Sequence, residues 1–125
     1  MSTPLRPRTI FYKHRAQFAA PEITTITGDG AIPVDRDSIT RLTKGSAAAV
    51  TVAAPGAKNI GRRLEIHGGS DFAHVVTFTG STLVDGTTGA SITWTSAAFA
   101  GSSLTVRALT ATLWSVIVNN LGTIA

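Results

Sequence analysis

Apolar residues alternate with polar or small residues in short stretches along much of this chain of 125 residues. Successive side chains of a β-strand point to opposite faces, so this alternation predicts strands with one buried and one solvated face. The stretches that show it most clearly are 49–53, 63–67, 73–79, 91–95, 103–109 and 112–119. Evidence for helices is poor by comparison, and a short helix within 9–20 is no better supported than an extended chain. The sequence therefore predicts an all-β protein.

Turn signals separate these stretches and indicate how the strands are connected. They are Pro55–Gly56, Gly68–Gly69, Asp85–Gly86, Thr88–Gly89 and Gly101. Upstream, residues 22–27 and 32–34 flank Gly28–Asp29–Gly30, which predicts a β-hairpin. Strands about 8 to 12 residues apart, without long helical crossovers, are typical of sandwiches and small barrels. We therefore expect an antiparallel β-sandwich or a small, jelly-roll-like β-barrel.

The alternation also predicts which side chains enter the core. The expected buried set is Val50, Val52, Leu64, Ile66, Val76, Phe78, Ile92, Trp94, Leu104, Val106, Ala108, Trp114, Val116 and Val118. Exposed indoles stack on sugar rings, so the two tryptophans also raise the alternative of a receptor- or carbohydrate-binding module. Large aromatic side chains dominate the cores of small domains, so we expect both tryptophans to be buried.

The formal net charge of +4 lies entirely in the first 21 residues. That segment contains four cations and no acid, whereas seven Lys/Arg balance seven Asp/Glu in residues 22–125. This split predicts two parts, an extended basic and aromatic N-terminal arm (1–21) and an all-β body (22–125). Pro4 and Pro7 restrict the free arm and so lower the entropy that it loses on binding.

Apolar side chains accompany the cations of the arm, which indicates a protein partner. Ordering about 20 residues costs roughly 1 to 2 kcal/mol for each backbone unit, so docking the arm requires a large surface on another subunit. Aromatic side chains could enter grooves there while the cations pair with carboxylates. The residues expected to make this contact are Arg6, Arg8, Ile10, Phe11, Tyr12, Lys13, Arg15 and Phe18. A solubilising tail is the alternative without a partner.

Nucleic acid is a further alternative for the arm, because cations interleaved with aromatic residues bind single strands. The body lacks a recognisable nucleic-acid motif and has no excess of cations. Arg62 and Arg63 are its one basic pair, and neighbouring strand residues point to opposite faces. We therefore expect protein rather than nucleic acid as the partner.

Charged residues are scarce in the second half of the body. Between Leu64 and Ala125 they are Glu65, Asp71, Asp85 and Arg107. About a quarter of the residues are charged in typical soluble domains, so this stretch predicts a surface partly covered by other copies of the chain. A threonine-rich β-surface that hydrates without charge is the alternative explanation.

No constellation of residues indicates catalysis, a metal or a cofactor, and we expect none of the three. His67, Asp71 and His74 lack the further ligands of a metal site, although they are close in sequence. Ser70, Ser102 and Ser103 have no nucleophile-elbow motif. The segment 56–61 begins like a phosphate-binding loop, but Arg62–Arg63 stand where Lys and Ser/Thr are required. The chain has no cysteine, which excludes disulfides and thiolate ligands.

Membrane insertion and secretion are not expected either. No apolar run approaches the roughly 20 residues that a membrane-spanning helix requires. The basic N-terminus is not followed by the apolar segment of a signal peptide. We expect a soluble intracellular protein, or a part of something assembled inside the cell.

Several strand motifs occur in an order that resembles small virion proteins of tailed bacteriophages. They are Leu-Thr-Lys-Gly (42–45), Ala-Val-Thr-Val (49–52), Gly-Arg-Arg-Leu-Glu-Ile (61–66), Ala-His-Val-Val-Thr-Phe (73–78), Gly-Ser-Ser-Leu-Thr-Val (101–106) and Leu-Trp-Ser-Val-Ile (113–117). The resemblance spans roughly residues 22–125, and its nearest match is the capsid decoration, or cement, proteins. These are β-repeat patterns rather than chemical signatures, so phage tail or fibre modules are an alternative.

The resemblance to decoration proteins implies a function and partners. It implies a homo-oligomer, most often a trimer, on the outside of the phage head. There the protein would bind the major capsid protein and bridge its subunits against internal pressure. The location implied is the exterior of the capsid in the virion, after synthesis in the host cytoplasm.

Overall fold

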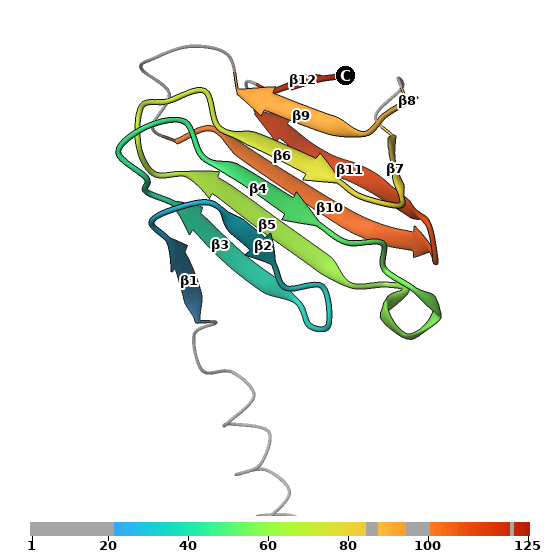
Figure 1. Cartoon of the computed structure of the whole chain (residues 1–125). Helices are drawn as coiled ribbons and strands as arrows, with labels where there is room; N and C mark the ends of the chain where they lie inside the picture. Colours follow the sequence, from blue (N-terminus) through green and yellow to red (C-terminus); the bar gives the residue numbers. More distant parts are fainter. Residues whose placement is uncertain (1–21, 85–87, 95–100, 121) are drawn as a thin grey trace, which may run out of the picture.

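The computed structural model describes residues 22–84, 88–94, 101–120 and 122–125, and these form two β-sheets packed face to face (Figure 1). The seven-stranded sheet has the order β1 (Ile23–Ile26), β3 (Ser38–Leu42), β5 (Arg63–Gly68), β10 (Ser103–Thr110), β11 (Leu113–Asn120), β7 (Thr82–Val84), β8 (Thr88–Gly89). The five-stranded sheet has the order β12 (Gly122–Ile124), β9 (Ser91–Trp94), β6 (Val75–Phe78), β4 (Ala49–Val52), β2 (Gly30–Ile32). A single turn of 3₁₀ helix, η1 (Ala57–Asn59), lies between β4 and β5. The predicted all-β sandwich is confirmed.

Strands β1 to β6 alternate between the two sheets, so that each pair of successive strands forms one coil. The strands of one coil lie parallel to those of the next, β3 beside β5 and β4 beside β6. Position 64 faces position 38 in one sheet, and position 75 faces position 49 in the other. In both sheets, therefore, a residue of the third coil lies beside the residue 26 positions earlier in the second coil. This half of the sandwich is therefore wound like a short β-solenoid.

The predicted hairpin at Gly28–Asp29–Gly30 is wrong, because β1 and β2 belong to different sheets. The turn is an arch that carries the chain from one sheet to the other. The Asp29 carboxylate fixes the arch to the second coil, where its Oδ1 accepts hydrogen bonds from the Ala49 N–H (2.8 Å) and from Lys44 Nζ (2.9 Å). A short turn with glycine is compatible with a hairpin within one sheet and with an arch between two sheets. In this chain hydrogen bonds to a distant segment favour the arch.

The predicted antiparallel pairing is correct for the C-terminal strands and wrong for the coils. β10 pairs antiparallel with β5 and β11, and β9 pairs antiparallel with β6 and β12. In the coils, by contrast, β1 to β6 pair in parallel within each sheet, and β7 pairs in parallel with β11. Alternation fixes which side chains are buried but not the direction of the neighbouring strand, because both pairings bury alternate residues.

The core between the sheets contains the side chains that alternation predicted, with two exceptions at the C-terminal end. Trp94 and Trp114 are fully buried, one from each sheet, and Trp114 Nε1 donates a hydrogen bond to the Ala53 carbonyl (3.2 Å). Val116 is half-buried at the margin of the core, and Val118 is exposed. Burial of both indoles leaves neither of them available to stack on a sugar.

Val118 lies on the outer face because of a β-bulge. Thr105 faces Val118 across the β10–β11 pair, whereas the next residue, Val106, faces Val116, so Ile117 is an extra residue on β11. A shift of one residue moves a side chain to the opposite face of a sheet. The bulge therefore overturns the prediction that Val118 belongs to the core.

Candidate interaction surface

The outer face of the seven-stranded sheet carries charged and large apolar side chains together. On β5 the inward Leu64 and Ile66 are fully buried, which places the intervening Arg63, Glu65 and His67 on the outer face. Register extends this face across the sheet, because Glu65 faces Ile39 of β3 and Ile39 faces Ile23 of β1. The mixture differs from an ordinary solvated strand face, on which polar residues dominate.

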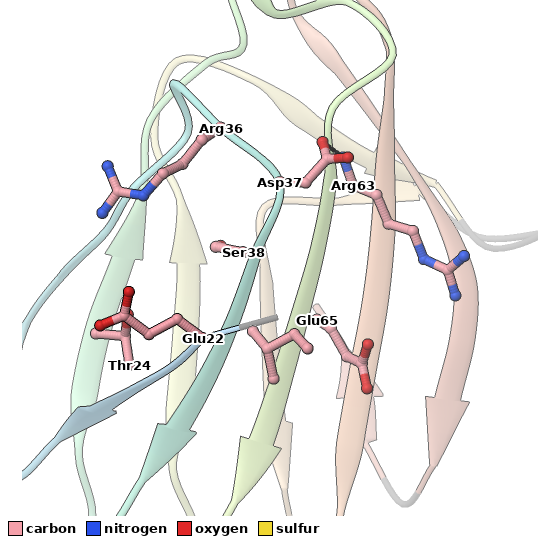
Figure 2. A pocket seen from close by; sticks show the side chains of 8 residues that line it. Glu22, Thr24, Arg36, Asp37, Ser38, Arg63 and Glu65 are labelled. Atoms are coloured by element: carbon pink, nitrogen blue, oxygen red, sulfur yellow. Dashed lines mark hydrogen bonds between the residues drawn. The ribbon is translucent and has the colours of Figure 1, made fainter. Parts of the chain in front are cut away.

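Two adjoining hollows follow strands β1, β3 and β5 on this face, with volumes of about 640 and 400 Å³. Both are lined by Ile39 and Glu65, so they form one depression, which we call the β1–β3–β5 groove. Figure 2 shows Glu22 and Arg36 on one side of the larger hollow and Arg63 and Glu65 on the other. The smaller hollow has a more apolar lining that includes Ile23 and three glycines, Gly68, Gly69 and Gly101.

Charges of both signs line the groove, and several are already engaged. Glu65 Oε1 lies 2.7 Å from His67 Nε2, and Arg36 forms an ion pair of 3.1 Å with Asp35. Asp37 Oδ1 accepts a hydrogen bond from the Arg63 backbone N–H (3.1 Å), which ties the start of β3 to β5. The groove therefore has no strong excess of either sign.

Arg63 and Arg107 face each other across β5 and β10, and both are exposed. Neither guanidinium lies within ion-pair distance of a carboxylate of the described residues. Like charges directly opposite in a sheet are destabilising by a few tenths of a kcal/mol to about 1 kcal/mol. An anionic group from another molecule would relieve this repulsion.

Beside Arg107, three aliphatic side chains project from β10 and β11. Leu109 is 51% exposed, Ile117 is 47% exposed and Val118 is 44% exposed. We call Arg107, Leu109, Ile117 and Val118 the β10–β11 ridge. β10 is the neighbour of β5 in the sheet, so the ridge and the β1–β3–β5 groove occupy adjacent halves of one face.

The outer face of the five-stranded sheet has a different composition. Its outward side chains, placed by the register of the described strands, are Ala31, Ala49, Thr51, Val75, Thr77, Ser91, Thr93 and Thr123. None of these is charged, and all are small or β-branched. The scarcity of charge that the sequence showed is thus concentrated on this face.

The residues considered for metal binding are not gathered into a site. His74 is buried, its Nδ1 accepts a hydrogen bond from the Ala48 N–H (2.9 Å), and its Nε2 faces Ser70 Oγ (3.1 Å). His67 is paired with Glu65 on the outer face. The part of the chain that the structure describes contains no group of three or more potential ligands that could hold a metal ion.

The pKa of Asp29 lies below its usual 3.8, mainly because the carboxylate accepts the hydrogen bond from the Ala49 N–H. The hydrogen bond and charge of Lys44 lower it further, and slight desolvation opposes them. This carboxylate stabilises the arch between β1 and β2 and does not lie on the interaction surface.

All eight residues predicted to anchor the arm, Arg6, Arg8, Ile10, Phe11, Tyr12, Lys13, Arg15 and Phe18, lie outside the described residues. The boundary between arm and body at residues 21 and 22 stays a prediction for the same reason. The arm precedes Glu22, which lines the groove, and β1, which is an edge strand of the seven-stranded sheet. No helix within the described ranges is long and apolar enough to span a membrane.

The groove and the ridge were missed at the sequence level. Ile39 lies on β3, which was not predicted as a strand, and Leu109 was the last residue of a predicted strand without an assigned face. One signal was available, since the run Val116-Ile117-Val118 breaks the alternation on β11 and so indicates a bulge.

Comparison with known proteins gives no relationship on which to base a function. The chain matches no protein-family model, and no curated protein or solved structure shows significant similarity to it.

Proposed function

We propose that this protein is a noncatalytic structural protein of a bacteriophage particle, a decoration protein that binds the outside of the head and bridges major capsid protein subunits. The observation that carries the proposal is the outer face of the seven-stranded sheet. Exposed aliphatic side chains lie there beside two arginines that form no ion pair with a carboxylate of the described residues. Apolar residues and arginine are enriched at the centres of protein interfaces. This supports a protein that works by association.

In the proposed mechanism the arm attaches the body to the capsid and the body associates with other copies, three of them if the resemblance holds. A standard protein interface buries roughly 1,200 to 2,000 Å². Several arms held by one oligomer bind with an effective concentration that multiplies the affinity of each arm. A trimer with three arms would thereby stabilise the shell even if each arm alone binds the capsid weakly. This mechanism requires no cofactor, metal or nucleic acid.

Co-sedimentation with phage heads that lack this protein tests the proposal. We expect the full chain to pellet with the heads, and expect a variant with Arg6, Arg8, Lys13 and Arg15 all replaced by Gln to bind at least tenfold more weakly. Raised salt should weaken the native contact, because ionic contributions are screened. A control with Lys58→Gln removes one exposed cation from η1. Equal binding by the fourfold variant would contradict the assigned role of the arm, and absence of binding by the native chain would refute the decoration function.

A phage tail or fibre module is the second candidate, and the parallel coils of β1 to β6 favour it. Coiled β-repeats stack along one axis, so they suit an elongated module in which each repeat contacts its neighbours. Imaging of intact particles with a label on this chain separates the candidates. A decoration protein is distributed over the head, whereas a tail or fibre module appears at one vertex or along the tail.

A further inference from the structure

We propose that copies of this chain associate through the outer face of the seven-stranded sheet, with the β10–β11 ridge of one copy seated in the β1–β3–β5 groove of the next. The inference deepens the proposed function, because it rests on the self-association named there. It assigns the surface that makes the contact and the way in which two copies meet.

Shape and polarity support a contact of ridge with groove. Leu109, Ile117 and Val118 are each close to half-exposed in one copy, so a partner can cover the remaining area. The smaller hollow of the groove offers Ile23, Ile39 and glycine backbone as an apolar lining. Burial of apolar area contributes about 25 cal/mol per Å² before the costs of association are subtracted.

Charge supports a second copy as the occupant. The ridge carries Arg107, which stands opposite Arg63 without a carboxylate partner among the described residues. The groove carries Glu22 and Glu65, both of which line its larger hollow, and Glu65 contacts His67 through Oε1. Arginine paired with carboxylate across an interface gives strong, directional hydrogen bonds. The described residues therefore provide both a cation that pairs with none of their carboxylates and acids that suit it.

The arrangement also accounts for a closed oligomer. Ridge and groove are different patches of one face, so the ridge of one copy can enter the groove of a second copy while its own groove receives the ridge of a third. This contact is heterologous, and an open row of copies ends in one free ridge and one free groove. Repetition of the contact closes a ring when the rotation between copies permits it. Three copies with this face turned toward a common axis would satisfy every ridge and every groove.

Mass measurement by light scattering or sedimentation tests the inference on the full chain. The native protein should have a mass that is a multiple of 12.9 kDa, expected to be about three times that value. Leu109→Asp on the ridge and Ile23→Asp in the groove should each give monomers, with the dissociation constant raised at least tenfold. Thr51→Asp is the control, because Thr51 is exposed and lies on the outer face of the other, five-stranded sheet. A monomeric native protein, or equal masses for the native chain and both face variants, would overturn the inference.

Mixing the two variants provides the sharper test. Leu109→Asp keeps an intact groove and Ile23→Asp keeps an intact ridge, so an equimolar mixture should form dimers of about twice 12.9 kDa although each variant alone is monomeric. Absence of these mixed dimers would refute a heterologous contact. The circular dichroism of each variant establishes that it is folded.

A charge exchange tests the same contact without placing a new aspartate on a strand, where Leu109→Asp or Ile23→Asp could disturb folding. Arg107→Glu should weaken association, and the double variant Arg107→Glu with Glu65→Arg should restore it at least in part. If the double variant associates no better than Arg107→Glu, the assigned ion pair is wrong. Binding to phage heads is measured separately, so loss of head binding with an unchanged mass refutes the proposed function and leaves this inference standing.

Discussion

The outer faces of the two sheets have the same underlying strand pattern and very different surfaces. The five-stranded sheet presents Ala, Thr, Ser and Val at its outward described positions, whereas the seven-stranded sheet presents Ile, Leu, Arg, Glu and His. Both sheets bury their inner residues equally well, with many side chains at or near zero exposure. The difference teaches that alternation specifies the core of this protein, while the identity of the outward residues gives one face uncharged small side chains and the other a mixture of charged and large apolar ones.

The largest effects are expected where the two sheets are alike, in the core. Trp94→Ala and Trp114→Ala should each lower the free energy of unfolding by about 3 to 5 kcal/mol, because both remove a fully buried indole. Urea denaturation followed by circular dichroism measures both. If one variant has the same urea midpoint as the native protein, the two sheets do not contribute comparably to one core. Their outer faces then cannot be compared as two surfaces of equally packed sheets.

Two histidines sharpen the contrast between inner and outer positions. His74→Leu should cost about 1 to 3 kcal/mol, because the buried Ala48 N–H loses its acceptor. His67→Leu is the outer counterpart, since its partner Glu65 is partly solvated on the groove face and the pair contributes little to folding. Urea midpoints of the two variants provide the measurement. Equal destabilisation would show that the outer face takes more part in stability than its exposure suggests.

The arginine pair tests whether the seven-stranded face sacrifices some fold stability for association. In the Ile23→Asp background, Arg107→Thr should raise the free energy of unfolding by roughly 0.2 to 1 kcal/mol, because the repulsion from Arg63 is removed. In the native background the same substitution should weaken self-association. Lys58→Thr is the control for loss of a cation away from the sheets. Destabilisation of the Ile23→Asp background by Arg107→Thr would contradict the repulsion.

The smallest expected effect lies at the arch, outside both faces. The pKa of Asp29 is lower in the folded chain than its usual 3.8, so the native state binds fewer protons than the unfolded state near this pH. Its contribution to stability is present above that value and is lost as the pH falls through the folded-state pKa. Asp29→Asn should therefore reduce the loss of stability seen on acidification below about pH 4, when measured by urea midpoints across pH. Asp35→Asn removes the same charge from an exposed pair and serves as the control. An unchanged pH dependence would show that the Ala49 hydrogen bond does not favour the ionised form.

Much of the fold was predictable because alternation is a local property of the chain. The strand stretches around Val50, Leu64, Val76, Ile92 and Leu104 were all recognised, and each of these side chains is buried. Strands β7, β8 and β12 were not recognised, because they have at most three residues. Strand β3 was missed although it has five residues, because its outward positions carry Ile39 beside Arg41 and so blur the alternation of polar and apolar residues. The prediction of a hairpin at Gly28–Gly30 was wrong, because a turn signal does not specify to which sheet the next strand belongs.

The interaction surface was not predictable from local patterns. Its groove combines Ile23, Ile39 and Glu65, which are adjacent through parallel register between strands separated by 16 and 26 residues along the chain. Its ridge depends on one bulge that turns Val118 outward. The scarcity of charge in the second half of the chain predicted a covered surface, but that scarcity lies on the five-stranded sheet and did not indicate the groove or the ridge.

By itself, the sequence determined the all-β class, the identity of most core residues and the separation of a basic arm from a neutral remainder, because all three follow from residue order and charge. Only the tertiary structure decided that the first six strands wind as parallel coils, and that apolar and charged side chains gather on one of the two outer faces. The physical reason is that strand direction and neighbours depend on hydrogen bonds between distant segments. Alternate burial is satisfied equally well by many arrangements, and long-range backbone pairing selects one of them.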